Sequence, residues 1–307
     1  MVSFFLKFMM KKLLKEKSEE FDLEEIRRDL IKGTSILKVS RGIQIQPLIL
    51  NGISAEKLSH KSNTLSTQSS SSFTLLYFHG GAYIGGSCDT HRALVSFLCK
   101  KLNVPAYIVN YRLAPEHPYP AALEDALIAY KWLLDKQSLT PDKIIIAGDS
   151  AGGGLALALL HRIRNLNLPL PKAAICFSPW TDLTLSNETI TSKVLEDPML
   201  SKSLLVNGSR MYVGQNNPSN PEISPLFADL SGFPPIFLQV GTREMLLDDS
   251  LQLAKLLKNA GSTVVLDVWE ELFHVFLVMA TMPFIGKFIP ECRRAIKNLK
   301  EFIDKLK

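Results

Sequence analysis

The chain has 307 residues, of which 46% are hydrophobic and 21% are charged, and its formal net charge is +5. This length suits one α/β domain with an accessory segment, and the composition predicts a packed core and argues against a disordered chain. The net positive charge is small and the sequence has no compact Lys/Arg patch with interleaved aromatic residues, so nucleic acid is not an expected partner.

The cysteines and the first residues of the chain bear on metal sites and on location. Cys88, Cys99, Cys176 and Cys292 are scattered, without a CxxC pair or metal-type spacing to a histidine. We therefore expect buried thiols in a reducing compartment, with no metal and no cofactor. No apolar run reaches the ~18 to 20 residues of a membrane span. Most of the positive charge in residues 1–12 follows the apolar stretch, the reverse of a secretory signal, which predicts a cytoplasmic protein.

Residues 1–40 are predicted to form a helical segment ahead of the main domain. Apolar residues recur there at roughly helical spacing among Lys and Glu, Asp22 is suited to cap a helix that begins at Leu23, and Gly33 is a candidate stop. We expect this segment to pack over an active site as a lid. The alternative is peripheral contact of the basic, apolar N-terminus with a membrane surface.

Residues 41–307 are predicted to form an α/β domain. Short alternating runs at 36–39 and 43–46 predict antiparallel edge strands, and the polar stretch 62–72 predicts a surface loop. Buried strands then alternate with helices. The predicted strands are 73–78, 106–109, 143–147, 173–177, 236–240 and 264–268, and the predicted helices are 90–102, 121–136, 151–165 and 250–259. This order predicts a mostly parallel central sheet with helices on both faces. Residues 181–225 interrupt it and are predicted to form a second lid element.

A G-x-S-x-G motif, Gly148 to Gly152, carries the strongest chemical signal. An apolar, β-branched run precedes it and a helix-forming run follows it, which is the strand–turn–helix setting of a nucleophile elbow. In such a turn the serine has a strained backbone, and the glycines leave room for neighbouring backbone. The helix N-terminus directs free N–H groups toward developing negative charge. We therefore predict Ser150 as a nucleophile.

A second glycine motif, His79-Gly80-Gly81, follows the predicted strand 73–78. Acyl transfer passes through a tetrahedral oxyanion that preorganised N–H donors stabilise. The predicted donors are the backbone N–H groups of Gly80, Gly81 and Ala151, the last directly after the nucleophile. His79 is expected to hold this loop by hydrogen bonds.

The general base is predicted by chain order. In α/β-hydrolases, for which such an elbow is typical, the acid and then the histidine follow the serine. Only His161 and His274 lie beyond Ser150. His161 falls three turns along the predicted helix, about 16 Å from the elbow, so His274 is the predicted base.

The acid should follow the preceding strand, 236–240. Glu244 lies where the chain leaves that strand, and Asp248 is the alternative. Asp248 and Asp249 are better suited to capping the next helix, so Glu244 is the predicted acid. Its role is to fix the tautomer of His274 and to stabilise the imidazolium.

Together, these motifs resemble the hormone-sensitive-lipase-like esterases. The resemblance spans residues 40–305 and includes the segments 79–83, 111–125, 148–153, 241–249 and the loop at His274. It implies an α/β-hydrolase fold with a helical lid, short-to-medium acyl substrates, and a structural role for 111–125 beside the active site. Relatives often form homodimers. Two departures are Ala82, where the family has a third glycine, and Glu244, where many members have Asp. With glutamate at this position the chain resembles a subgroup that contains acetyl-hydrolases and ε-lactone hydrolases. This resemblance implies acetyl esters and lactones as alternative substrates.

The predicted function is a serine carboxylesterase that hydrolyses a small-molecule ester through an acyl-enzyme. Tyr83 and residues 199–211 are expected to line the substrate pocket. The alternatives are an amidase or deacetylase with the same triad, and a non-catalytic ligand-binding relative.

Overall fold

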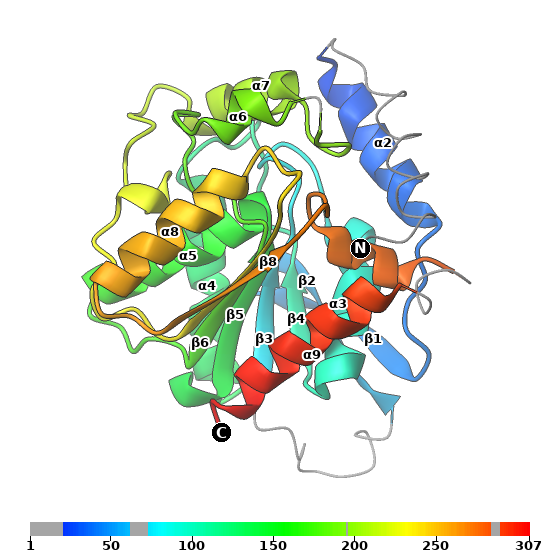
Figure 1. Ribbon diagram of the computed structural model, residues 1–307. Coiled ribbons are helices and arrows are strands. Elements are labelled where there is room, and N and C mark those ends of the chain that lie inside the picture. Colours follow the sequence, from blue (N-terminus) through cyan, green and yellow to red (C-terminus); the bar gives the residue numbers. More distant parts are fainter. Residues whose placement is uncertain (1–20, 62–72, 195, 284–288) are drawn as a thin grey trace.

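The computed structural model describes residues 21–61, 73–194, 196–283 and 289–307. One eight-stranded sheet runs through its centre in the order β1-β2-β4-β3-β5-β6-β7-β8 (Figure 1). The predicted loop 62–72 and residues 1–20 of the predicted lid segment lie outside the described residues.

The sheet is mostly parallel, as predicted. Its strands are β1 (Ile43–Leu50), β2 (Ile53–His60), β3 (Thr74–Phe78), β4 (Ala106–Val109), β5 (Ile144–Asp149), β6 (Ala173–Phe177), β7 (Ile236–Gly241) and β8 (Val264–Trp269). Every neighbouring pair from β4 through β3 to β8 is parallel, and β2 pairs antiparallel with both β1 and β4. Parallel strands end at a common edge, so the loops after β3, β5, β6, β7 and β8 meet there.

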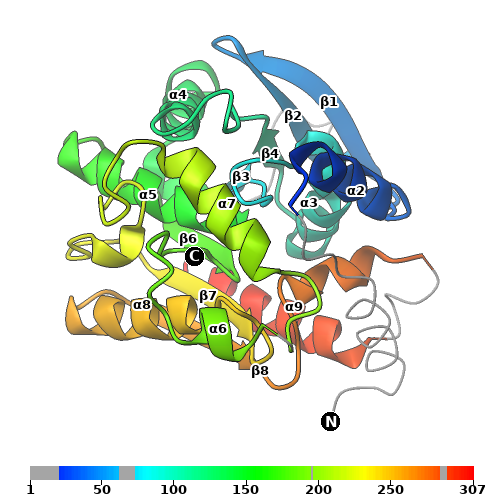
Figure 2. The ribbon, with the colours of Figure 1, turned by 90° about the horizontal axis from the view of Figure 1, so that it is seen from above.

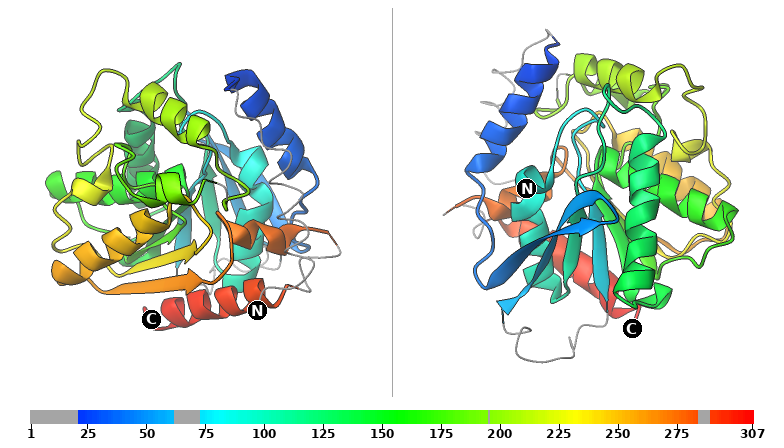
Figure 3. Two further views of the ribbon diagram at one scale, coloured as in Figure 1. Left: turned by 45° about the horizontal axis from the view of Figure 1, so that its top comes forward. Right: turned by 180° about the vertical axis from the view of Figure 1, so that it is seen from behind.

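Helices cover both faces of the sheet, and its central strands are therefore buried on two sides. One core layer contains α4 (Ala121–Lys136), α5 (Ala151–Asn165) and α8 (Leu247–Asn259), and the opposite layer contains α3 (Cys88–Leu102) and α9 (Pro290–Asp304). The two layers lie on either side of the sheet in Figure 3. This arrangement is an α/β-hydrolase architecture, which confirms the predicted fold class.

Three further helices lie above the carboxyl edge of the sheet (Figure 2). They are α2 (Leu23–Ser35), α6 (Thr189–Ser192) and α7 (Lys202–Val213). The last two belong to the interruption at 181–225. No helix in the described ranges has the length and apolarity needed to cross a bilayer.

The predicted start of α2 is confirmed, but its predicted end is wrong. The Asp22 side chain caps it by accepting from Glu25 N–H at 3.0 Å. The helix passes through Gly33 and ends at Ser35, and its last hydroxyls, of Thr34 and Ser35, donate to carbonyls of the preceding turn. The strand predicted at 36–39 is therefore absent from this part of the described chain.

The predicted capping of α8 is also wrong. The helix begins at Leu247, so Asp248 and Asp249 lie in its first turn. Asp249 is buried and accepts from Thr181 N–H at 2.6 Å and Asp182 N–H at 2.9 Å, while Asp248 accepts from Thr189 N–H at 3.1 Å. Both carboxylates thus bind the 181–225 segment to α8, a long-range use that local sequence does not reveal.

Candidate active site

Ser150 sits on a sharp turn between β5 and α5. Its backbone has φ 53° and ψ −123°, a conformation that few residues other than glycine adopt. The flanking glycines make this turn possible. A Cβ on Gly148 would lie 2.3 Å from Gly152 O, and one on Gly152 would lie 2.1 Å from Phe78 O. The turn is the geometry expected of a nucleophile elbow.

His274 and Glu244 come together at the same edge. His274 Nδ1 lies 3.0 Å from Glu244 Oε2, and both side chains are buried. A carboxylate only accepts hydrogen bonds, so Nδ1 carries a proton, and in the neutral imidazole Nε2 has the free lone pair. Glu244 Oε1 accepts from Gly241 N–H at 2.6 Å, which fixes the carboxylate at the end of β7.

Ser150 and His274 line one cavity. Within the described residues no hydrogen bond joins them. Catalytic hydrogen bonds of free enzymes are often long and tighten only around substrate.

The pKa of His274 is raised above its ordinary value. Burial alone would lower it, but the hydrogen bond that His274 donates to Glu244 and the charges of Glu244, Asp197 and Asp149 outweigh that effect. The pKa of Glu244 is also raised. Here burial is the largest cause, and the hydrogen bond from His274 opposes it. A base with a raised proton affinity suits removal of a proton from a serine hydroxyl.

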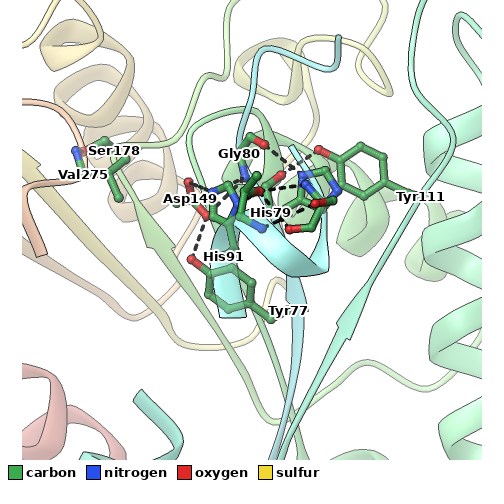
Figure 4. Close-up of polar contacts among 10 residues, drawn as sticks. Tyr77, His79, Gly80, His91, Tyr111, Asp149, Ser178 and Val275 are labelled. Carbon is green, nitrogen blue, oxygen red and sulfur yellow. Dashed lines mark hydrogen bonds and ion pairs between the residues drawn. The ribbon is translucent and has the colours of Figure 1, made fainter. Parts of the chain in front are cut away.

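A buried polar network around Asp149 supports the loop after β3 (Figure 4). Asp149 Oδ1 accepts from Tyr77 OH at 2.7 Å and from Gly80 N–H at 3.2 Å, and Oδ2 lies 3.2 Å from His91 Nε2. Burial opposes ionisation of Asp149, but the charge and hydrogen bond of His91 and the Tyr77 bond lower its pKa. Tyr111, from the segment with a predicted structural role, donates to the carbonyl of His79 at 2.6 Å.

This network also engages Gly80, one of the predicted oxyanion donors. The N–H of Gly80 is bound to Asp149, and Gly80 is not among the described residues that line the cavity. Gly81 and Ala82 do line it, and Ala151 begins α5 directly after Ser150. A Cβ on Gly80 would lie 2.3 Å from Asp149 Oδ2, so this glycine allows a close contact with Asp149.

His79 is buried beneath this loop, in a position to hold it by hydrogen bonds as predicted. Its ring stacks on Tyr111 at 4.2 Å between centroids, and Nδ1 donates to Gly80 O at 2.8 Å. Burial, assisted by the nearby His91, lowers the pKa of His79 to about 3 from 6.5. Below pH 6.5 the unfolded chain therefore binds a proton that the folded chain does not.

A stability measurement tests this state of His79. The free energy of unfolding should fall as pH drops from 6.5 toward 3, because the unfolded chain takes up the proton. Above pH 6.5, His79 should cause no further change in this free energy. Between pH 7.5 and pH 5.0 the wild type should lose about 2 kcal/mol more than His79→Gln, which has no group to titrate. Denaturant unfolding of both proteins at both pH values measures this difference. Equal losses would show that His79 is protonated in the folded chain.

The cavity above Ser150 has a volume of about 170 Å³ and a mostly apolar wall. Its apolar side chains are Ile26, Leu30, Leu94, Met199, Leu200, Leu204, Leu205, Val275 and Val278. Four of these side chains come from the range 199–211, which is predicted to line the substrate pocket. The prediction for Tyr83 does not hold. Tyr83 is 1% exposed, stacks on Tyr212 at 3.7 Å between ring centroids, and is not among the described residues that line the cavity.

The α2 helix closes one side of this cavity with Ile26 and Leu30. Arg27, between them, anchors the helix. It forms two 2.7 Å hydrogen bonds with Glu116 and donates to Ile84 O at 2.8 Å. Gly85 leaves space for Leu30, whose Cδ1 lies 2.8 Å from where a Cβ would be.

Two residues that sequence reasoning missed connect these parts. Ser178, after β6, donates to Glu244 Oε1 at 2.7 Å. Asp197 accepts from Met245 N–H at 2.9 Å and from Met199 N–H at 2.8 Å, which ties the cavity wall to the residue after Glu244. Both act across more than 40 positions in sequence, so no local pattern marks them.

Comparison with known proteins agrees with this geometry. A family model described as the alpha/beta hydrolase fold matches residues 75–278. The chain belongs to this family. It is 40% identical over 230 residues to an acetyl-hydrolase of Streptomyces hygroscopicus, covering 75% of each chain. It is 35% identical to an esterase of Acinetobacter venetianus, covering 86% of this chain and 83% of that one.

Comparison with solved structures identifies the subgroup of α/β-hydrolases to which the chain is similar. A crystal structure of an esterase from the bacterial hormone-sensitive lipase family superposes with a TM-score of 0.89 at 34% identity, covering 100% of this chain and 99% of that one. The hydrolase is therefore a hormone-sensitive-lipase-like carboxylic-ester hydrolase, as the sequence motifs predict.

Proposed function

We propose that this hydrolase cleaves short-to-medium acyl esters through a Ser150–His274–Glu244 triad and an acyl-enzyme. The observation that carries the proposal is the buried His274–Glu244 pair, which lies at the cavity that Ser150 lines. In α/β-hydrolases this pairing of acid, base and elbow serine performs acyl transfer.

In the first half-reaction, Ser150 Oγ attacks the ester carbonyl and its proton passes to His274 Nε2. Glu244 stabilises the resulting imidazolium. The tetrahedral oxyanion accepts hydrogen bonds from backbone N–H groups, and the alcohol leaves with the proton from His274. Water then attacks the acyl-enzyme, gives a proton to His274, and releases the acid as Ser150 regains its proton.

For the oxyanion we propose the N–H groups of Gly81, Ala82 and Ala151. Gly81 and Ala82 line the cavity, and Ala151 lies at the positive end of the α5 dipole. Alanine at position 82 retains the N–H that this role requires.

Residues 1–40 and 181–225 are proposed as two lid elements over the catalytic domain, 41–307. Their described parts supply most of the apolar cavity wall, which would bind the acyl chain by burying its CH₂ groups. A small cavity favours acyl chains of short to medium length, and acetyl esters fit the same proposal. Homodimer formation and contact of the N-terminus with a membrane stay predictions.

Matched ester and amide substrates test the reaction class. We expect hydrolysis of p-nitrophenyl butyrate with kcat/KM falling as the acyl chain lengthens beyond the medium range. The matched p-nitroanilide should react at least about 10²-fold more slowly, because an amide carbonyl is less electrophilic than an ester carbonyl and an anilide is a poorer leaving group than p-nitrophenolate. Comparable rates on both substrates would favour the amidase alternative, and hydrolysis of neither would favour a ligand-binding protein.

A further inference from the structure

Ser178 lies directly after β6, between the segments that carry the acid and the base. Its side chain is buried, and its N–H donates to Gln239 O at 2.7 Å, which holds it against β7. Its hydroxyl donates to Glu244 Oε1 at 2.7 Å. It also accepts from Val275 N–H at 3.1 Å, and Figure 4 shows Ser178 beside Val275. One hydroxyl therefore contacts the acid and the residue that follows the base.

We propose that Ser178 is a positioning residue for the catalytic acid, an inference that rests on the proposed function. Two donors, Ser178 OH and Gly241 N–H, meet at Glu244 Oε1. They leave Oε2 for His274 at 3.0 Å. With one oxygen held by two fixed donors, the carboxylate plane is set and Oε2 faces the imidazole.

The direction of the Ser178 hydroxyl is itself fixed. A serine hydroxyl rotates to suit its partners, and it has one donor and two acceptor lone pairs. Because Val275 N–H occupies a lone pair, the O–H is directed to Glu244. Ser178 thereby acts through Glu244 and not through contact with substrate, and it is not among the described residues that line the cavity.

A glutamate has particular need of such a residue. It has one more rotatable side-chain bond than aspartate, and its terminal torsion is broad, so its carboxylate is less well fixed by rotamer preference alone. Glu244 is completely buried, where an incompletely bonded carboxylate is costly. The Ser178 hydrogen bond restricts the longer side chain and supplies one of the hydrogen bonds that its buried carboxylate needs.

A double-mutant cycle separates this role from a merely structural one. Ser178→Ala should lower kcat for p-nitrophenyl butyrate about tenfold with KM unchanged. In a Glu244→Gln background, where the acid no longer functions, Ser178→Ala should cost less than about twofold. A tenfold loss in both backgrounds, or no loss in the otherwise wild-type chain, would overturn the proposal.

Ser96→Ala is the matched control. Like Ser178, the buried Ser96 hydroxyl donates one hydrogen bond and accepts one from a distant N–H. It donates to the carbonyl of Ala93 at 2.7 Å and accepts from Ser40 N–H at 2.9 Å. It should affect thermal stability but leave kcat unchanged. Ser178→Gly, which suits the φ of 47° at this position, repeats the cycle if the alanine variant does not fold. Absence of ester hydrolysis in the wild type would refute the proposed function instead, before any Ser178 variant is compared.

Discussion

Replacing Glu244 by glutamine should lower kcat for ester hydrolysis by roughly 10³- to 10⁴-fold. The amide has the size of the acid but carries no charge, so it neither stabilises the imidazolium nor holds Nδ1 protonated. The raised pKa of His274 depends on this hydrogen bond and charge, so the variant also loses proton affinity at the base. Steady-state kinetics with p-nitrophenyl butyrate measure the loss, and KM should change little because Glu244 does not line the cavity.

Asp248→Asn is the matched control, since Asp248 is the alternative acid by sequence. Its carboxylate accepts from Thr189 N–H at 3.1 Å, in the 181–225 segment. We expect kcat within about threefold of the wild type, with a small loss of stability. If Asp248→Asn lost activity while Glu244→Gln retained it, the assignment of the acid would be wrong.

Gly152→Ala should destabilise the fold by roughly 3 kcal/mol and reduce activity by at least about 10²-fold. The added Cβ would lie 2.1 Å from Phe78 O and 2.5 Å from His79 O. Both are backbone atoms at the end of β3, so relief requires moving the oxyanion loop away from Ser150. Thermal unfolding and kcat/KM measure the two effects.

Gly33→Ala gives the contrasting result. Gly33 lies inside α2 with nothing within 4 Å of a Cβ and no positive φ. Alanine should therefore leave activity intact and stabilise the helix by up to about 1 kcal/mol. A benign Gly152→Ala would mean that the close packing of α5 against the loop after β3 is not required.

The sheet, its helices and the elbow could be predicted because each has a local cause. The apolar strand 144–149 and the glycines around Ser150 act within a few residues of each other, and chain order then restricts the base to His274. The start of α2, capped by Asp22, and the bounds of α4 and α5 follow from equally local signals.

The remainder depends on contacts between distant segments. Gly80 is a glycine because of the Asp149 carboxylate, and Tyr83 is buried because Tyr212 from α7 stacks on it. Ser178 reads as an ordinary residue at the end of a strand, and Asp249 as a helix cap, until the fold brings their partners to them. Sequence periodicity carries no information about these pairings.

Covalent labelling of the nucleophile tests the central claim most directly. The wild-type protein, treated with a fluorophosphonate and examined by peptide mass spectrometry, should carry one phosphonyl adduct on Ser150. The adduct should be absent in Ser150→Ala and form far more slowly in His274→Ala. An adduct on another residue, or p-nitrophenyl butyrate hydrolysis by Ser150→Ala at the wild-type rate, would contradict the account.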